Sequence, residues 1–308
     1  ERPGEEGQDL PDGERVIVRR SAWRRIALLV GFGLLALLVV AILLLWIDRR
    51  QIATHFIKHE LEQRGVQGSY RLDRVGFRTQ EVSNLVIGDP KHVSVCSGFE
   101  VLVNQGKESS LSITGDDNLL AEIIVEERRD EITIGFPETL SDYEPTEAIL
   151  VELTLPDLRE IDGDGGVNIR LENSFQLGEL DVEISGGSMF QVEELRAKKL
   201  DLSMSGGGLS DMFGLELDEL DVDASSGGWI GVHGRATRIE GEFSGGGMLD
   251  AFECNADHVE LELSGGSEAK VRVAKTLDVD ASGGSQVTYR GEPKVKKQLS
   301  GGSEIIVD

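Results

Sequence analysis

Aromatic residues and cysteines are scarce in this sequence. Aromatic side chains make up 5% of its 308 residues, including three tryptophans and three tyrosines. Many β-helices are carbohydrate-cleaving enzymes, but these need exposed aromatic rings that stack on sugars, so the scarcity disfavours that class. The two cysteines, Cys96 and Cys254, are too few and too far apart for a disulfide framework. We expect two small buried thiols, with a single structural disulfide as the alternative.

Motifs of catalytic and cofactor sites are also missing. The sequence has no nucleophile elbow, phosphate-binding loop, metal-ligand spacing or dinucleotide fingerprint. The five histidines are scattered, at His55, His59, His92, His233 and His258. His55 and His59 are one helical turn apart but form neither His-Glu-x-x-His nor its inverse, which favours two surface histidines over a metal site. We therefore predict no enzyme activity, and no catalytic, cofactor-binding or metal-ligating residue.

Basic residues are few in the larger, C-terminal part of the chain. Residues 92–308 contain 17 Lys and Arg against 44 Asp and Glu, whereas residues 1–91 contain 14 against 12. Such an acidic surface repels the phosphates of DNA and RNA, so we exclude nucleic acids as partners. Acidity also keeps a repetitive β protein soluble and blunts its sheet edges, an explanation that we favour over cation binding.

Charged residues are absent from one stretch near the N-terminus. Residues 26–47 form an uncharged, mostly apolar run of 22 residues, long enough for one helix to span a bilayer. A cleaved signal peptide would have a shorter apolar core followed by small residues, whereas Asp48 and Arg49 follow here. Four arginines precede the run and two follow it, which predicts a cytoplasmic tail at residues 1–25. We expect a single-pass anchor in the lipid bilayer, with the rest of the chain exported.

Residues 48–91 are predicted to form a juxtamembrane helix and a short β segment. Ile52, Phe56 and Leu61 fall at near-helical spacing, and Gly65 is a natural C-terminal stop. Nothing in the anchor predicts helix pairing, and the oligomeric state stays open.

The segment from residue 23 to residue 89 resembles the N-terminus of the YdbH-type intermembrane phospholipid transport proteins, an AsmA-like group. The resemblance is carried by the helix after the anchor, by residues 64–66 (Arg-Gly-Val) and by residues 84–90 (Asn-Leu-Val-Ile-Gly-Asp-Pro). It implies an inner-membrane anchor followed by a long β groove that crosses the periplasm. The sequence changes character near residues 91–95, before such a groove. Phospholipid transport is therefore the alternative function.

One repeat organises the rest of the chain. Ser-Gly-Gly begins at Ser185, Ser205, Ser226, Ser244, Ser264, Ser282 and Ser300, and Asp164 begins an earlier Asp-Gly-Gly variant. Each motif follows a five-residue segment of alternating apolar and polar residues, which is typical of a strand with one buried face. Units of about 20 residues bury their apolar side only by stacking, and a glycine pair permits a tight corner in each unit.

We therefore predict an all-β fold, a parallel β-helix of about eight coils over residues 162–308. The crossover preference makes the coils right-handed. The corner serines are expected to form a structural ladder in which hydroxyls satisfy each other or turn amides. Residues 163–166 (Gly-Asp-Gly-Gly) are similar to calcium-binding solenoid turns, but the 9-residue period is missing, so calcium is disfavoured.

Residues 92–161 lack the repeat and are expected to form short strands. Apolar segments at 101–103, 111–113, 123–125, 132–134 and 150–155 alternate with turns. We expect this region to cap the end of the solenoid, which would otherwise expose pairing edges.

This larger region resembles the family described as "putative auto-transporter adhesin, head GIN domain". The resemblance is carried by residues 105–109, 115–120 and 155–158 and by the Ser-Gly-Gly units up to the C-terminus, in that order. It implies a β-solenoid, often exported and tethered to the envelope, and it transfers no functional residue. The two resemblances meet near residue 92, so the sequence is interpreted as a natural mosaic of two families, a fusion or an artificial sequence.

From these observations we expect a structural, adhesion-like or protein-interaction module of the bacterial envelope. The resemblances place its anchor in the inner membrane and its solenoid in the periplasm. An envelope protein or a glycan is the expected partner.

Overall fold

The computed structural model describes residues 71–75, 79–85, 87–137, 140 and 145–308. The predicted tail at 1–25, the anchor at 26–47 and the juxtamembrane helix with His55 and His59 lie outside the described residues. Within the described ranges, no helix is both long and apolar enough to cross a membrane.

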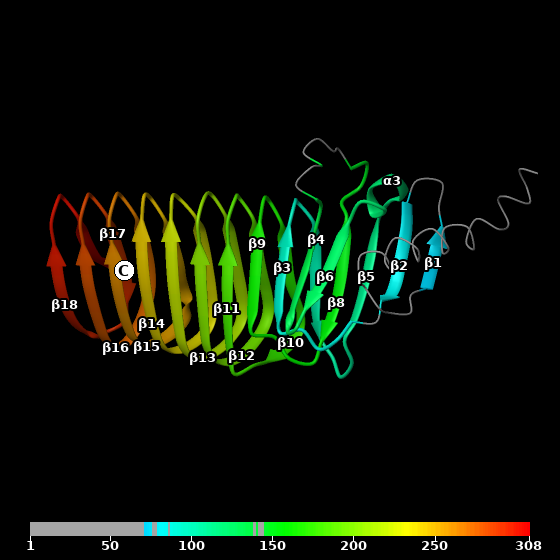
Figure 1. Ribbon diagram of the computed structural model, residues 1–308. Helices are drawn as coiled ribbons and strands as arrows, with labels where there is room; N and C mark the ends of the chain where they lie inside the picture. Colours follow the sequence, from blue (N-terminus) through cyan, green and yellow to red (C-terminus); the bar gives the residue numbers. More distant parts are fainter. Residues whose placement is uncertain (1–70, 76–78, 86, 138–139, 141–144) are drawn as a thin grey trace, which may run out of the picture. The chain divides into compact units, whose positions relative to one another are not determined.

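The described part of the chain is all-β apart from one short helix, and its strands form one 19-stranded sheet (Figure 1). The strands of the N-terminal region are β1 (Arg71–Val75), β2 (Thr79–Leu85), β3 (His92–Cys96), β4 (Glu100–Gln105), β5 (Ser110–Asp116), β6 (Ile124–Arg128), β7 (Glu131–Gly135) and β8 (Leu150–Leu155), with helix α3 at Asp117–Leu120. The following strands are β9 (Glu160–Asp164), β10 (Asn168–Gln176), β11 (Glu179–Ile184), β12 (Met189–Met204), β13 (Leu209–Ser225), β14 (Trp229–Ser244), β15 (Met248–Leu263), β16 (Glu268–Ala281), β17 (Gln286–Arg290), β18 (Lys294–Leu299) and β19 (Glu304–Val307).

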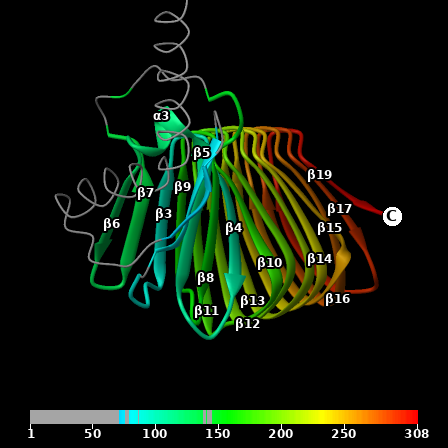
Figure 2. The same ribbon diagram turned by 90° about the vertical axis from the view of Figure 1, so that its right-hand side faces the viewer.

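Each turn of the solenoid has two broad sides joined by a curved segment, as strand β12 shows. Its first part, residues 189–192, pairs in parallel with residues 209–212 of β13, and its last part, residues 199–204, pairs with residues 219–224. We call the side that follows each glycine corner the leading face and the side that precedes the next corner the trailing face. Both faces keep their register from turn to turn, and Figure 2 shows the turns lying one behind another.

The sequence prediction of a parallel β-solenoid is confirmed, with about seven turns rather than about eight. The difference follows from how turns are counted. One corner begins at Asp164 and seven begin at the serines, and these eight corners enclose seven turns between them.

Inward side chains of successive turns stack and fill the interior. One trailing-face row consists of Leu180, Leu200, Leu220, Ile239, Val259 and Leu277, which are paired in register and almost fully buried. Alternation puts every second residue of each strand into this core, as the five-residue segments predicted. Burial of these apolar side chains is the main stabilising contribution to the fold.

At six of the eight corners both glycines of the pair have positive φ, and at the corners that begin at Ser205 and Ser226 only the first glycine does. Gly265 and Gly266, for example, have φ of +69° and +83°, a region in which side chains with a Cβ are strained. The expected ladder of corner serines is not present: the hydroxyl of Ser185 bonds Asp164, and no described corner serine hydroxyl bonds another one or a turn amide. A different serine, the one that follows the glycine pair, is buried and hydrogen-bonded to backbone groups of the corner, as Ser188, Ser267 and Ser285 show.

The N-terminal end of the solenoid has an interleaved strand order. Strand β3 lies between β7 and β9, and β4 lies between β8 and β10, all in parallel pairs. The coil formed by β3 and β4 is thus inserted between two segments that come later in the chain. Beyond it, β5 pairs antiparallel with β8 and β2, and β6 pairs antiparallel with β7. Region 92–161 therefore contributes strands to the stack as well as strands outside it.

The two cysteines are not paired with each other. Cys96 is half-buried and Cys254 is buried, and both are free thiols. The alternative, a structural disulfide between Cys96 and Cys254, is therefore absent. The expected burial of both thiols is confirmed for Cys254, whereas Cys96 is only half-buried.

Candidate functional site

The outward side of the trailing face carries two rows of carboxylates. In the first row, paired residues are Glu160, Asp181, Asp201, Asp221, Glu240, Glu260 and Asp278. The second row, two residues further along each strand, contains Asp162, Glu183, Asp223, Glu242, Glu262 and Asp280, with Ser203 between Glu183 and Asp223. Adjacent strands are about 4.8 Å apart, so these like charges repel each other along the rows.

Basic side chains offset part of this repulsion. Lys199 Nζ lies 2.8 Å from Asp201 Oδ1 and 2.8 Å from Asp221 Oδ2, and these hydrogen bonds raise the pKa of Lys199. The pKa of Asp201 is itself raised, because its partial burial outweighs the effect of Lys199 and the neighbouring carboxyl of Asp221 adds to it. Arg238 binds Glu240 and Glu260 in the same manner two turns further along.

The second carboxylate row and five of the corner serines line a groove of about 790 Å³. Carboxylates lie close together there, and glycoside-cleaving enzymes use a pair of carboxylates. Phe243 is the one aromatic residue among the described lining residues, and it is buried. The groove therefore offers no exposed ring on which a sugar could stack.

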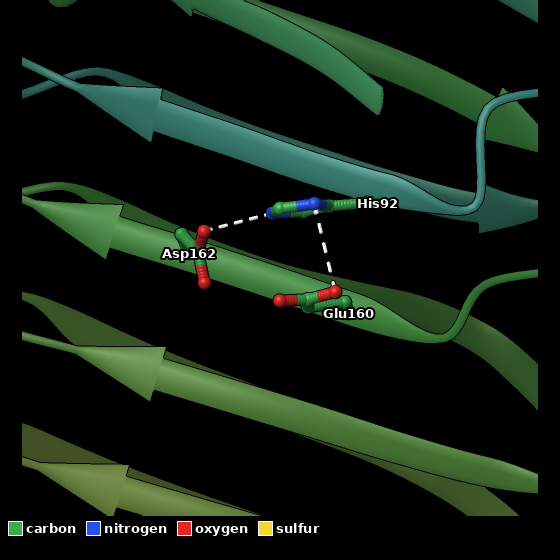
Figure 3. A group of neighbouring side chains, drawn as sticks. All are labelled: His92, Glu160 and Asp162. Carbon is green, nitrogen blue, oxygen red and sulfur yellow. Dashed lines mark hydrogen bonds and ion pairs between the residues drawn. The ribbon is translucent and has the colours of Figure 1, made fainter. Parts of the chain in front are cut away.

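The interleaved strand order brings His92 next to two acidic residues. His92 on β3 faces Glu160 and Asp162 on β9, because His92 pairs with Glu160 and Ser94 pairs with Asp162. His92 Nε2 lies 2.8 Å from Asp162 Oδ2, and Nδ1 lies 3.5 Å from Glu160 Oε2 (Figure 3). One potential ligand atom from each residue lies within 4.8 Å of the other two, so the cluster has the donor set of a metal site.

The other described histidines have different surroundings. His258 Nδ1 lies 2.7 Å from Thr276 Oγ1. His233 stacks on Phe213 with ring centroids 4.3 Å apart, and its Nε2 lies 3.3 Å from Asp211 Oδ1. Sequence spacing missed the acidic partners of His92, because about 70 residues separate them from it.

The leading face differs from the trailing face in its chemistry. An outward row of Met189, Leu209, Trp229 and Met248 runs over four successive turns in register, and all four side chains are partly exposed. Nearby, Phe213 is 46% exposed, and the guanidinium of Arg290 lies 4.2 Å from the ring centre of Phe252. The solenoid therefore presents an acidic face and a partly apolar face.

Comparisons with known proteins agree with the two resemblances. A family model described as "Putative auto-transporter adhesin, head GIN domain" matches residues 89–293. A second model, "Intermembrane phospholipid transport protein YdbH", matches residues 36–123. No curated protein gives a significant match. The matches indicate no catalytic family.

Solved structures share the fold at low sequence identity. A "putative adhesin" from Parabacteroides merdae is 20% identical with a TM-score of 0.68, over 75% of this chain and 95% of that one. A "putative lipid binding protein" from Parabacteroides distasonis is 22% identical with a TM-score of 0.68, over 75% of this chain and 96% of that one. A "putative adhesin" from the same species is 20% identical with a TM-score of 0.67, over 79% and 98%.

These structures support the β-solenoid as the fold of the described region. The family model covers more than half of the chain, including the interleaved N-terminal strands and nearly all of the glycine corners. The chain therefore belongs to the family of the auto-transporter adhesin head GIN domain.

Proposed function

We propose that this protein is a membrane-anchored, exported β-solenoid that acts as an adhesion-like interaction module of the bacterial envelope. Residues 26–47 anchor it in the inner membrane, with the N-terminus in the cytoplasm and the right-handed solenoid in the periplasm. The family match and the adhesin-type neighbours support the module, and the uncharged 22-residue run with its flanking arginines supports the anchor.

The observation that carries the proposal is the outward apolar row on the leading face. Met189, Leu209, Trp229 and Met248 occupy equivalent positions on successive turns, although outward positions of the trailing face are mostly charged. Contiguous apolar side chains at a protein surface mark interaction sites.

Local packing holds the indole of Trp229 in a fixed place on this face. A Cβ added to Gly231 would lie 2.5 Å from Cη2 of Trp229, so the ring lies directly over the glycine. The strand itself is paired on both sides, which makes the row a rigid surface rather than a free sheet edge. Such a surface fits an envelope protein or a glycan, since both can place apolar groups or sugar rings against Trp and Met.

Phospholipid transport is the second candidate. It is favoured by the match of residues 36–123 to the YdbH model and by one similar structure, that of a "putative lipid binding protein". A transporter needs an open apolar groove, however, and the inward rows of this solenoid are filled by buried side chains such as Leu200, Leu220 and Val259. The interaction module is therefore the better-supported function.

The test of the anchor is a topology measurement in bacterial cells. A reporter that is active only outside the cytoplasm is fused after Asp308, and the cells are fractionated. We expect an active reporter in the membrane fraction. An inactive reporter, or a soluble active protein, would contradict the proposed anchoring.

The test of the interaction surface uses a photo-cross-linking residue in the full chain. One variant carries it at Leu209 on the leading face, and the control carries it at the exposed Glu242 on the trailing face. We expect an envelope adduct from position 209 that disappears when Met189 is replaced by Asp, and none of that size from position 242. Equal adducts from both positions would count against the leading face.

A further inference from the structure

We propose that His92, Glu160 and Asp162 bind a divalent transition-metal ion of the zinc type. The ion would bind one ring nitrogen of His92 and one oxygen of each carboxylate, with water completing its coordination. The site would join the inserted coil of β3 and β4 to the continuous solenoid that begins with β9.

The distances are compatible with such an ion. Zinc binds His nitrogen and carboxylate oxygen at about 2.0–2.2 Å, which places tetrahedral ligand atoms about 3.3–3.5 Å apart. The separation of 3.5 Å between His92 Nδ1 and Glu160 Oε2 is at this value, and the 2.8 Å between His92 Nε2 and Asp162 Oδ2 is shorter. The two carboxylates lie against different ring nitrogens, so one of them must turn toward the nitrogen that the other already faces; the potential ligand atoms already lie within 4.8 Å of one another.

A second observation also points to a missing partner. The other oxygen of Asp162, Oδ1, is buried and has no hydrogen-bond partner among the described residues. A buried carboxylate oxygen without a partner is costly, because it has lost water and gained nothing in exchange. Oδ1 of Asp162 is thus an acceptor that hydrogen bonds leave free, next to the Oδ2 that faces His92.

The surroundings of the cluster supply negative charge. The next strand places Asp181 beside Glu160 and Glu183 beside Asp162. Lys91, which precedes His92, is paired with Asp157 at 2.8 Å. The cluster is thus a local concentration of acceptors around one imidazole, and this attracts a cation.

The donor chemistry selects the class of metal. Calcium and magnesium prefer all-oxygen sites, whereas imidazole together with carboxylates suits zinc and neighbouring transition metals. The parallel strands β3 and β9 hold the three ligands in register, so the site needs no rearrangement of the backbone.

The test is zinc titration of the full-length chain, purified in detergent and freed of metal with a chelator. The background carries His55→Gln and His59→Gln, so that these histidines contribute nothing. We expect saturable binding of one zinc ion near neutral pH. His92→Gln and Asp162→Asn should each weaken binding at least about tenfold. His258→Gln removes another histidine of the trailing face and should change the affinity less than about twofold, because His258 pairs with Thr276 rather than with carboxylates.

Thermal unfolding checks that each variant is folded and gives a second readout. Zinc should raise the Tm of the background protein but not that of the His92→Gln variant, since a ligand stabilises only the state that binds it. If His92→Gln fails to fold, Asp162→Asn decides the question. The proposal would be overturned if zinc showed no saturable binding or if neither substitution weakened the binding. It would also be overturned if equimolar calcium displaced the zinc, and this outcome would assign the cation to the carboxylate rows.

Discussion

The ring of Phe243 occupies the space that a side chain at Gly241 would need. A Cβ added to Gly241 would lie 2.6 Å from Cε2 of Phe243 and 3.0 Å from Cδ2 of Leu261. Gly241 takes an inward position that Val222 and Leu261 fill in the neighbouring turns. The large ring and the missing side chain therefore compensate for each other within one turn.

We predict that Gly241→Ala destabilises the protein by about 1–3 kcal/mol, because it overpacks a filled core. Phe243→Leu should recover part of this loss in the double variant, since the shorter side chain leaves room for the added methyl group. Urea unfolding of the single and double variants measures the coupling. Gly178→Ala is the matched control, as an added Cβ there meets nothing within 4 Å. Equal losses at 178 and 241 would contradict the packing argument.

Ser188→Ala should destabilise the solenoid more than Ser185→Ala. Ser188 Oγ accepts hydrogen bonds from the amides of Gly166 (3.2 Å) and Val167 (3.1 Å) and donates one to Ser185 O (2.6 Å). Its removal leaves buried backbone groups without this partner, at a cost of about 1–3 kcal/mol.

The hydroxyl of Ser185, in contrast, bonds the exposed carboxylate of Asp164. Water can replace that hydrogen bond, so Ser185→Ala should cost less than about 1 kcal/mol. The denaturant midpoints of the two alanine variants measure which serine contributes more to stability. A larger loss for Ser185→Ala would show that the first serine of the motif is the structural one.

Lys199→Met should lower stability near neutral pH by about 0.5–1 kcal/mol, a range that allows for solvent screening of a partly exposed group. The folded-state pKa of Lys199 is raised, so its contribution is complete below the ordinary lysine pKa and is lost only as the pH rises through the folded value. On the acid side, the contribution is lost as its partner Asp201 becomes protonated.

Because the pKa of Asp201 is raised, this acid-side loss should begin above the ordinary Asp range. The unfolding free energies of the parent protein and of Lys199→Met should therefore converge as the pH falls from 7 to about 3. Lys198→Met, at the exposed neighbouring position, is the control. A constant difference across this range would show that packing of the lysine stem, rather than its charge, matters.

Cys254 should react much more slowly than Cys96 with a thiol reagent in the native protein. Burial raises the pKa of the Cys254 thiol to about 11, so little of the reactive thiolate is present near neutral pH, and the side chain is inaccessible. Cys96 is half-buried. Labelling of the Cys96→Ser and Cys254→Ser variants, before and after denaturation, measures each thiol separately; fast native labelling of Cys254 would contradict the buried position.

Much of the fold could be predicted from local patterns in the sequence. Alternating segments such as residues 180–184 specify strands with one buried face, and the glycine pairs specify corners, because both signals lie within a few residues. Their regular spacing then requires stacked turns, since no single unit can bury its apolar side. The carboxylate rows follow from the same alternation once the register is known.

The neighbours of strands outside the repeat were decided only by the tertiary structure. Any strand edge offers the same backbone donors and acceptors, so the sequence of β3 does not specify that it pairs with β7 and β9. The cluster of His92, Glu160 and Asp162 depends on that pairing, which is why no linear motif predicted it.

The C-terminal end shows the same division between local pattern and three-dimensional context. Lys297 lies at the position that Val279 fills in the preceding turn, so a charged residue stands in an inward row. Its side chain is exposed, whereas Val279 is buried. The sequence by itself determined the repeating unit, its corners and its family. The tertiary structure alone decided which units are neighbours, because pairing between distant strands depends on the whole stack rather than on any local run of residues.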